Sequence, residues 1–223
     1  MLTLGIDDAG RGPVIGPMIL AGCLLDEDAK NELKKLGVKD SKQLTQKRRE
    51  FLEVKIKESA KAFDSVVILP EEIDKSNAEG VKLNEVEAIA CAKIINKINK
   101  GAEKIKIILD CPSTSILKWQ DFLKTKVDNL SNLEIVCEHK ADQNHVAVSA
   151  ASILAKCIRE REMKNLREKY GKDIGSGYTS DPLTKKFLTK NKKKLNSHGI
   201  FRKTWITWKK IDKSSNQKKL TDF

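Results

Sequence analysis

Four aspartates, Asp7, Asp8, Asp110 and Asp142, stand where predicted elements of structure meet. The first three each end an apolar stretch that predicts a strand, and Asp142 lies between a predicted strand and a predicted helix. A buried strand seldom ends in an acid followed by tight-turn residues unless a cation lies there. The four positions are therefore candidates for cation binding.

Several carboxylates without a set of His or Cys ligands suit hard cations such as Mg²⁺ or Mn²⁺. Two such ions about 4 Å apart activate water and stabilise the leaving oxygen when a phosphodiester is hydrolysed, so no nucleophilic side chain is needed. Spacing alone leaves an alternative open, in which some of these acids are helix caps or surface ion pairs. Capping is a real competitor for Asp142, which just precedes a helix.

The strand period places Asp7 and Asp8 on opposite faces. Asp7 shares the side of Thr3 and Gly5, where small neighbours leave room around it. The two acids could serve one site only if the chain bends at Asp8. The segment 9–12, which contains two glycines, supplies a backbone that permits such a bend.

The elements that position these acids alternate between strands and helices. Strands are predicted over Leu2–Asp7, Met18–Leu25, Ser65–Leu69, Lys104–Asp110 and Leu133–Cys137. Helices are predicted from an N-cap at Thr45 through Phe63, over Val81–Asn99 and over Val146–Lys169. This order indicates an α/β fold with a mixed sheet flanked by helices.

The positive charge is concentrated near the C-terminus. The chain of 223 residues has 43 Lys and Arg against 31 Asp and Glu, a net charge of +12, and residues 185–219 alone account for +12. Such a localised field favours a polyanionic partner, nucleic acid before an anionic membrane. A lysine-rich tail that only improves solubility is equally compatible with the charge.

Other features of the composition limit the class of protein. The apolar stretches are too short to span a bilayer and no export signal precedes the first predicted strand, so we expect no membrane association and a cytoplasmic location. The five cysteines form no Cys-x-x-Cys pair and are expected to be reduced thiols.

Five ordered blocks resemble the type 2 ribonucleases H (ribonuclease HII), and the later ones resemble the archaeal and eukaryotic branch more than the bacterial one. The blocks are Gly5–Pro13, Asp40–Leu44, Leu109–Ser113, Lys140–Ile153 and Gly175–Tyr178. The resemblance covers about residues 1–185 and implies a ribonuclease H-like fold, a mixed five-stranded sheet with helices on both sides and a small C-terminal helical part. On this basis we expect a catalytic domain over 1–170, a basic helical subdomain over 171–213 and a flexible tail over 214–223.

The resemblance also implies an activity, which is endonucleolytic cleavage of RNA in RNA/DNA hybrids and cleavage 5′ of single ribonucleotides in duplex DNA. The products would carry a 5′-phosphate and a 3′-hydroxyl. The four aspartates match the acids that hold two Mg²⁺ or Mn²⁺ ions, with Asp7 as the expected bridge between them. The residues that match substrate contacts are Gly10, Arg11 and Gly12 at the ribose 2′-hydroxyl, Tyr178 at the sugar of the junction, and Lys42 and Arg159 near phosphates.

Two of these matches have plain alternatives. By spacing alone, Arg159 could equally pair with Glu162 along its helix, and Tyr178 could be an ordinary half-buried aromatic. Position 8 departs from the family pattern, which has Glu where this chain has Asp8. The shorter side chain reaches about 1.5 Å less far, and we expect activity to be retained with an altered metal optimum.

The last seven residues resemble the peptide that binds the DNA sliding clamp. Gln217, Leu220 and Phe223 have the required spacing, although the usual peptide has two aromatic residues and this one has a single one. Such peptides insert their apolar residues into a clamp pocket from a disordered tail. A basic tail that ends by chance in Phe is the alternative.

Two other functions compete with the ribonuclease. One is a repair endonuclease of similar fold that acts on deaminated bases, although the Gly10–Gly12 and Gly177–Tyr178 segments argue against it. The other is a non-catalytic, clamp-associated module that binds hybrids, which would follow if Asp8 disabled the metal site. We expect the chain to act as a monomer.

Overall fold

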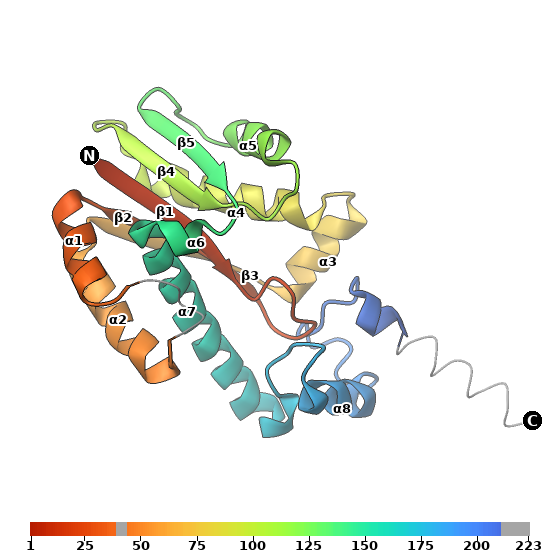
Figure 1. The fold of residues 1–223 in the computed structure, drawn as a ribbon. Helices are drawn as coiled ribbons and strands as arrows, with labels where there is room; N and C mark the ends of the chain where they lie inside the picture. Colours follow the sequence, from red (N-terminus) through yellow and green to blue (C-terminus); the bar gives the residue numbers. More distant parts are fainter. Residues whose placement is uncertain (39–43, 211–223) are drawn as a thin grey trace, which may run out of the picture. The chain divides into compact units, whose positions relative to one another are not determined.

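A computed structural model of the chain describes residues 1–38 and 44–210 (Figure 1). Its centre is a five-stranded sheet in the order β3-β2-β1-β4-β5. The strands are β1 Leu2–Ala9, β2 Met18–Leu25, β3 Ala62–Ile68, β4 Ile105–Asp110 and β5 Leu133–Glu138. β1 pairs with β2 in antiparallel fashion, whereas β1–β4 and β4–β5 are parallel. The predicted mixed α/β sheet is confirmed.

Helices occupy most of the connections between strands. They are α1 Glu27–Lys35, α2 Gln46–Ser59, α3 Pro70–Ala78, α4 Leu83–Ile98, α5 Ile116–Lys124, α6 Ala141–Asn144, α7 Val146–Tyr170, the 3₁₀ helix η2 Lys172–Ile174 and α8 Pro182–Asn191. The three predicted helices are present as α2, α4 and α7, and Thr45 is the N-cap of α2, accepting from the Arg48 amide. The sequence patterns did not predict α1, α3, α5 or α6.

The prediction that α2 reaches Phe63 is wrong. Its C-cap, Ala60, is extended, with φ −73° and ψ 137°, and the Lys61 amide donates to the Leu24 carbonyl of β2. Phe63 therefore lies in β3. The apolar spacing carried on past the helix end because the first residues of an edge strand are also apolar.

The chain divides into two compact units, which do not follow the expected boundary at residue 170. The first unit contains residues 1–9, 19–67 and 82–158, and the second contains residues 10–18, 68–81 and those from 159 onward. The division falls within α7, and the second unit takes two segments from the N-terminal half of the chain. The expected tail over 214–223 lies outside the described residues.

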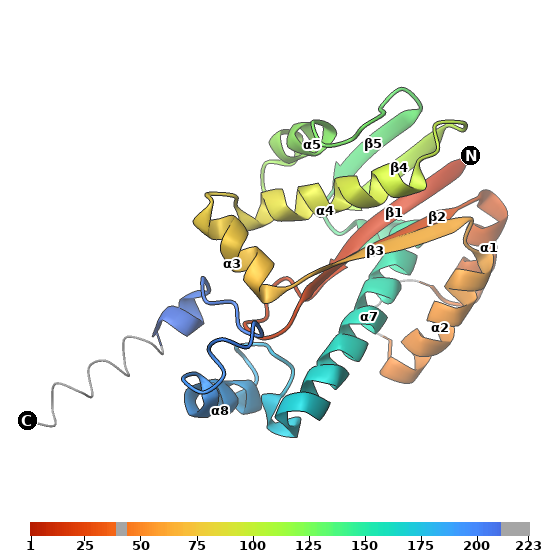
Figure 2. The same ribbon diagram turned by 180° about the vertical axis from the view of Figure 1, so that it is seen from behind.

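In the first unit, helices cover both faces of the sheet. α1, α2, α6 and the start of α7 cover one face, and α4 and α5 cover the other (Figures 1 and 2). Glycine allows close packing on each side: a Cβ on Gly5 would lie 2.1 Å from the Ala147 carbonyl carbon, and one on Gly22 would lie 2.5 Å from Ile94 Cγ2. The start of α7 thus lies directly against β1, next to the strand end that carries Asp7.

The second unit has its own apolar core. It is made of Val14, Ile15, Ile174, Phe187, Leu188, Leu195, Ile200, Phe201 and Trp208. Ile15 forms an isolated bridge with Phe201, and the Val14 amide donates to the Gly177 carbonyl at 2.9 Å. This core therefore joins residues 14–15 to the region 174–208, which is far away in the sequence.

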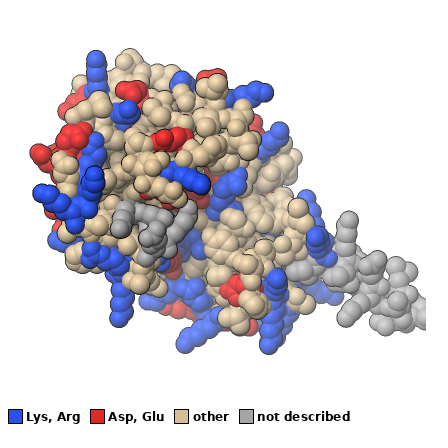
Figure 3. Space-filling view, in the orientation of Figure 1, with Lys and Arg blue, Asp and Glu red and all other residues tan. Residues whose placement is uncertain are grey.

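Exposed lysines accompany α8 and the segments after it. They are Lys185, Lys186, Lys190, Lys193, Lys194, Lys203, Lys209 and Lys210. Figure 3 shows basic side chains projecting around the region of α8. Among the helices within residues 1–38 and 44–210, none combines the length and the apolar character needed to cross a bilayer.

Candidate active site

Asp7 and Asp110 lie at the carboxyl ends of adjacent parallel strands. The last register pair of β1 and β4 is Ile6 with Leu109, so the two acids follow it side by side. Asp7 is only 7% exposed. By strand alternation it faces the same side of the sheet as Gly5, the side on which α7 packs.

Asp142 is brought to the end of β4 by α6. The Ala141 amide donates to Asp110 Oδ1 at 3.1 Å, and Ser149 Oγ of α7 donates to the Asp142 carbonyl at 2.5 Å. Asp142 is 2% exposed and lies inside α6, whose N-cap position is Lys140. It therefore caps neither α6 nor α7, and its buried carboxylate lies one residue from an amide that binds Asp110.

The electrostatics of Asp7 show how closely these acids gather. The pKa of Asp7 is raised to about 8, first by burial and then by the neighbouring carboxylates of Asp8 and Asp110, while a hydrogen bond with Ser152 acts in the opposite direction. Like charges held in a poorly solvated place disfavour ionisation of each other. A nearby divalent cation would reverse this effect.

The expected bend at Asp8 is absent. β1 continues to Ala9, with Asp8 paired to Leu20 and Ala9 to Ile19 in an unbroken register. Asp8 therefore faces the same side as Ile6, the side covered by α4. Backbone pairing with β2 outweighs the permissive glycine that follows, so Asp7 and Asp8 lie on opposite faces of the strand end.

A small cleft at this strand end contains an acid that the sequence analysis did not single out. It is lined by Ile6, Asp7, Asp8, Leu20, Glu87, Cys91, Asp110, Pro112 and Trp119. Glu87 comes from α4 and is 2% exposed. In the sequence, a glutamate among the apolar residues of this helix could have marked Glu87 as a candidate, because a glutamate seldom occupies a buried position by chance.

The acids suit a hard cation by donor type but are not arranged as a finished site. Within residues 1–38 and 44–210, no three His, Cys, Asp or Glu side chains are grouped so as to hold a metal ion. Carboxylate oxygens are nevertheless the ligands that Mg²⁺ and Mn²⁺ prefer, and the raised pKa of Asp7 shows unbalanced negative charge. The residues present thus fit a divalent ion that draws the carboxylates together.

In the second unit, Gly10, Arg159 and Tyr178 gather at one place. Gly10 has φ +81°, and a Cβ there would lie 2.3 Å from Arg159 Nε. The Arg159 guanidinium lies 5.1 Å from the centre of the Tyr178 ring, and a Cβ on Gly12 would lie 3.7 Å from that ring. The residues matched to ribose and sugar contacts therefore share one cluster.

Arg159 is held in this cluster by the turn before Tyr178. Its Nη2 donates to the Ser176 carbonyl at 3.0 Å, and burial lowers its pKa. Arg159 therefore contacts the Ser176 carbonyl and the Tyr178 ring. Tyr178 is 40% exposed, so its ring remains available to a ligand.

Two side chains of α8 fix that turn. Asp181, the N-cap, accepts from the Ser176 amide at 2.7 Å. This hydrogen bond is the largest cause of its lowered pKa. Thr184 is fully buried; its hydroxyl accepts from the Gly177 amide and donates to the Ile174 carbonyl, both at 3.0 Å. The Gly-Ser-Gly-Tyr segment is therefore a rigid support for the tyrosine.

Several predicted residues fall outside these two clusters. Lys42 and the clamp-binding candidates Gln217, Leu220 and Phe223 lie outside the described residues. The two histidines that flank Asp142 have other partners: His139 Nδ1 lies 3.0 Å from the Cys111 carbonyl, and His145 pairs with Glu138.

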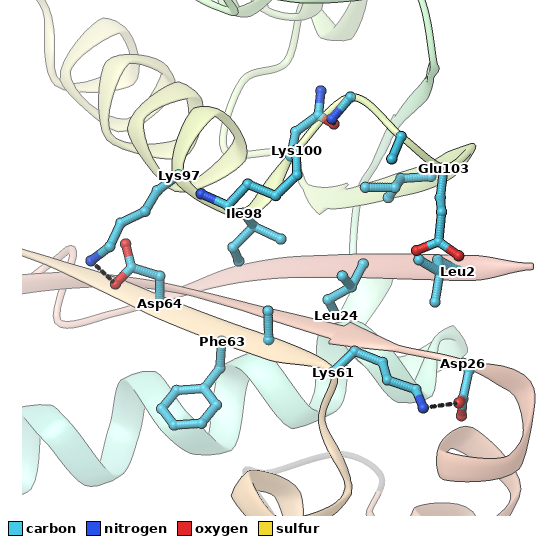
Figure 4. A pocket seen from close by; sticks show the side chains of 15 residues that line it. Leu2, Leu24, Asp26, Lys61, Phe63, Asp64, Lys97, Ile98, Lys100 and Glu103 are labelled. Carbon is cyan, nitrogen blue, oxygen red and sulfur yellow. Dashed lines mark hydrogen bonds and ion pairs between the residues drawn. The ribbon is translucent and has the colours of Figure 1, made fainter.

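A larger groove lies at the other end of β1. Leu2, Leu24 and Ile105 are among the residues that line it, together with two ion pairs, Lys61 to Asp26 at 2.9 Å and Lys97 to Asp64 at 2.6 Å (Figure 4). In both pairs the charge of the aspartate is balanced by a lysine. This end of the sheet therefore lacks the unbalanced charge found around Asp7.

Comparison with known proteins identifies the relatives of this chain. A sequence profile described as Ribonuclease HII matches residues 4–208. A ribonuclease HII of Methanococcus maripaludis strain C7 is 44% identical over 98% of this chain and 90% of its own length. The crystal structure of ribonuclease H2 from Pyrococcus horikoshii superposes with a TM-score of 0.86 at 36% identity, covering 97% of this chain and all of that one.

A second solved relative is the ribonuclease HII of Archaeoglobus fulgidus in complex with PCNA. It superposes with a TM-score of 0.80 at 36% identity, covering 92% of this chain and 95% of that one. The agreement extends over the sheet and its flanking helices.

Proposed function

This chain belongs to the ribonuclease HII family, and on that premise we propose that it cuts RNA within RNA/DNA hybrids and cuts 5′ of single ribonucleotides in duplex DNA. The family makes it a ribonuclease H-type hydrolase. The proposal adds the substrate range, the side of the cut and the ends produced, a 5′-phosphate and a 3′-hydroxyl. The observation that carries it is the crowding of carboxylates around Asp7.

We assign Asp7, Asp8, Asp110 and Asp142 to the binding of two Mg²⁺ or Mn²⁺ ions. Asp7 and Asp8 lie on opposite faces of β1, but both line the cleft at its end, which supports a shared site without a bend. Such ions supply activation of water and stabilisation of charge on the leaving oxygen. The protein's part is to hold the acids: β1 and β4 place Asp7 and Asp110 side by side, and the bond from the Ala141 amide places Asp142 near them. Ser152 orients Asp7 by a hydrogen bond.

The cluster in the second unit would recognise the substrate. Glycines at 10 and 12 allow main-chain atoms to approach a ribose closely, and the 2′-hydroxyl is the group that distinguishes RNA from DNA at one nucleotide. Tyr178 offers an exposed ring to a sugar. Arg159 and Lys42 are assigned to phosphates, and the lysines around α8 add an attraction that should weaken as salt rises.

The test is cleavage of four labelled duplexes of one sequence: an RNA/DNA hybrid, DNA with one ribonucleotide, DNA with one inosine, and DNA alone. We expect cleavage of the first two in Mg²⁺ or Mn²⁺ and none with a chelator. Cleavage at inosine would support the repair endonuclease instead. Binding of the hybrid without hydrolysis in either metal would support a non-catalytic module.

We also propose that the C-terminal tail binds the sliding clamp through Gln217, Leu220 and Phe223. The support is the spacing of these residues and the complex that a 36% identical relative forms with PCNA. Deletion of residues 220–223 should abolish capture by the clamp and leave hydrolysis of free substrate unchanged. A truncated chain that still binds the clamp would refute this assignment.

A further inference from the structure

Arg202 is a fully buried arginine, with 0% of its surface exposed. An arginine is rarely buried unless its guanidinium is fully engaged. Its guanidinium donates to main-chain carbonyls of one segment, the Gly10–Gly16 loop, which starts with the residues matched to the ribose, and it lies over the Trp205 ring, 5.0 Å from Cζ to the ring centre. The functional assignments above leave this side chain without a role.

The guanidinium makes four hydrogen bonds to that loop. Nη1 donates to the Arg11 carbonyl at 2.6 Å, and Nη2 donates to the Gly10 carbonyl at 2.6 Å. Nη2 and Nε also donate to the Gly16 carbonyl, at 3.0 and 3.2 Å. Hydrogen bonds from an ionised donor are stronger than neutral ones, so the two ends of the loop are tied to one rigid planar group.

The segment that carries Arg202 is itself anchored. The Arg202 amide donates to the Val14 carbonyl at 2.9 Å. Asp74 accepts from the Lys203 amide at 2.7 Å and from the Thr204 amide at 3.0 Å. Val14 belongs to the loop itself, so the anchor outside the loop is Asp74, which fixes the backbone that follows Arg202.

We propose that Arg202 is a positioning residue that aims the amides of Arg11 and Gly12 at the ribose 2′-hydroxyl. The inference rests on the proposed function. In a trans peptide the carbonyl and the following N–H point in opposite directions across one plane. Fixing the Gly10 and Arg11 carbonyls on the guanidinium therefore directs the next two amides, those of Arg11 and Gly12, away from it.

The same contacts strengthen those amides as donors. A cation bound to a carbonyl polarises the whole peptide group, because hydrogen bonds in a chain reinforce one another. This geometry requires glycine at position 10, because φ there is +81° and a Cβ would lie 2.3 Å from Arg159 Nε. Arg202 therefore sets both the direction and the strength of the main-chain donors.

Trp205 supplies a matched control within the same loop. Its indole nitrogen donates to the Gly12 carbonyl at 3.1 Å, but the nitrogen of that peptide belongs to Pro13 and bears no hydrogen. The Trp205 ring also lies over the Arg202 guanidinium, 5.0 Å from Cζ to the ring centre, so the replacement has to keep an aromatic ring there. Trp205→Phe does so, and it removes the hydrogen bond without releasing any main-chain donor. Trp205→Phe should therefore leave recognition of the 2′-hydroxyl intact, although it removes a contact of the same kind.

The experiment compares two quantities for each variant. One is kcat/KM for DNA with a single ribonucleotide, and the other is the inhibition constant of the same duplex without it, which lacks only the 2′-hydroxyl. Arg202→Met should lower kcat/KM by about 10- to 100-fold, the effect of losing well-formed hydrogen bonds. The inhibition constant should change by no more than about twofold, because phosphate contacts remain.

Two further variants keep the test decisive. Arg202→Lys replaces the guanidinium, which contacts three carbonyls, with a single ammonium. Its kcat/KM should fall between that of the wild type and that of Arg202→Met. This variant takes the place of Arg202→Met if the methionine variant does not fold. Trp205→Phe should retain both quantities to within about threefold, as expected for one neutral hydrogen bond.

The outcomes are distinguishable. A parallel loss of kcat/KM and of affinity for plain DNA, or equal effects of Arg202→Met and Trp205→Phe, would make Arg202 a merely structural residue and overturn the inference. A wild-type chain that cuts no ribonucleotide-containing duplex would overturn the proposed function, and this inference with it.

Discussion

The two ends of the central sheet in the first unit use aspartate in opposite ways. At the amino end of β1, Asp26 and Asp64 are each paired with a lysine, and hydrogen bonds from the Ala29 amide and from Lys61 lower the pKa of Asp26. At the carboxyl end, Asp7 is buried beside other acids, and its pKa is raised to about 8. The same side chain therefore contributes to stability at one end and is costly at the other.

This difference shows where function resides in the first unit. A protein selected only for stability has no reason to bury acids together, since each neighbour makes the others harder to ionise. The cost at the carboxyl end is explained by a ligand of opposite charge. The larger groove, at the amino end, needs no such ligand because its charges are already balanced.

The strongest test replaces one acid at each end. Asp7→Asn should lower kcat by about 1,000-fold or more, because it removes an electrostatic contact that acts on the transition state, whereas Asp64→Asn should leave kcat unchanged. Single-turnover cleavage of the ribonucleotide-containing duplex measures both. Equal losses in the two variants would remove the distinction between the ends.

A second prediction concerns Asp8, which faces the α4 side with Glu87. Asp8→Asn should reduce the rate in both Mg²⁺ and Mn²⁺ by about 10- to 100-fold, the scale of one lost electrostatic contact. Asp8→Glu restores the family's residue and should raise the rate in Mg²⁺. Metal titrations of the rate give the result, and an unchanged rate for Asp8→Asn would show that this acid is not a ligand.

A third prediction concerns stability without metal. Near pH 7 the metal-free folded chain holds Asp7 mostly protonated, because its pKa is raised to about 8, whereas the unfolded chain ionises it. Asp7→Asn removes this cost, so it should raise the Tm of metal-free protein by about 2–4 °C, the shift that about 1 kcal/mol produces in a chain of this size. Added Mg²⁺ should raise the Tm of the wild type and not that of the variant. A lower Tm for metal-free Asp7→Asn would contradict the charge crowding inferred here.

The smallest effect is expected at the paired end. Lys97→Met removes the partner of Asp64, and Lys97 is 68% exposed. Exposed ion pairs contribute about 0.2–1 kcal/mol, so the unfolding midpoint in urea should fall only slightly and the change should shrink at high salt. A large loss of stability would show that this end of the sheet depends on its charges as much as the other.

Local patterns predicted the strands and three helices because these depend on apolar spacing and caps. They failed at Phe63, where an apolar period ran across a helix end into a strand. At Asp8 the strand period was right: pairing with β2 keeps Asp7 and Asp8 on opposite faces, and the bend that the following glycine permits does not occur. At both places hydrogen bonds to a distant strand decide the backbone.

The candidate site shows the same division. The four acids, Gly10, Gly12 and Tyr178 could be named from ordered motifs, because each stands at a strand end or in a turn with a recognisable composition. Glu87 and Arg202 could not be named in that way. The significance of Glu87 comes from its burial at the strand-end cleft, and that of Arg202 comes from hydrogen bonds to residues far away in the chain; neither follows from the ordered motifs.

The sequence by itself determined which groups the protein has for its chemistry: acids that suit hard cations, glycines beside them and a basic C-terminal region. The tertiary structure alone decided which of them meet. Asp7 and Asp110 become neighbours because two parallel strands share one register. Arg202 meets Gly10 because an apolar core and Asp74 bring residues some 190 positions apart into hydrogen-bonding distance.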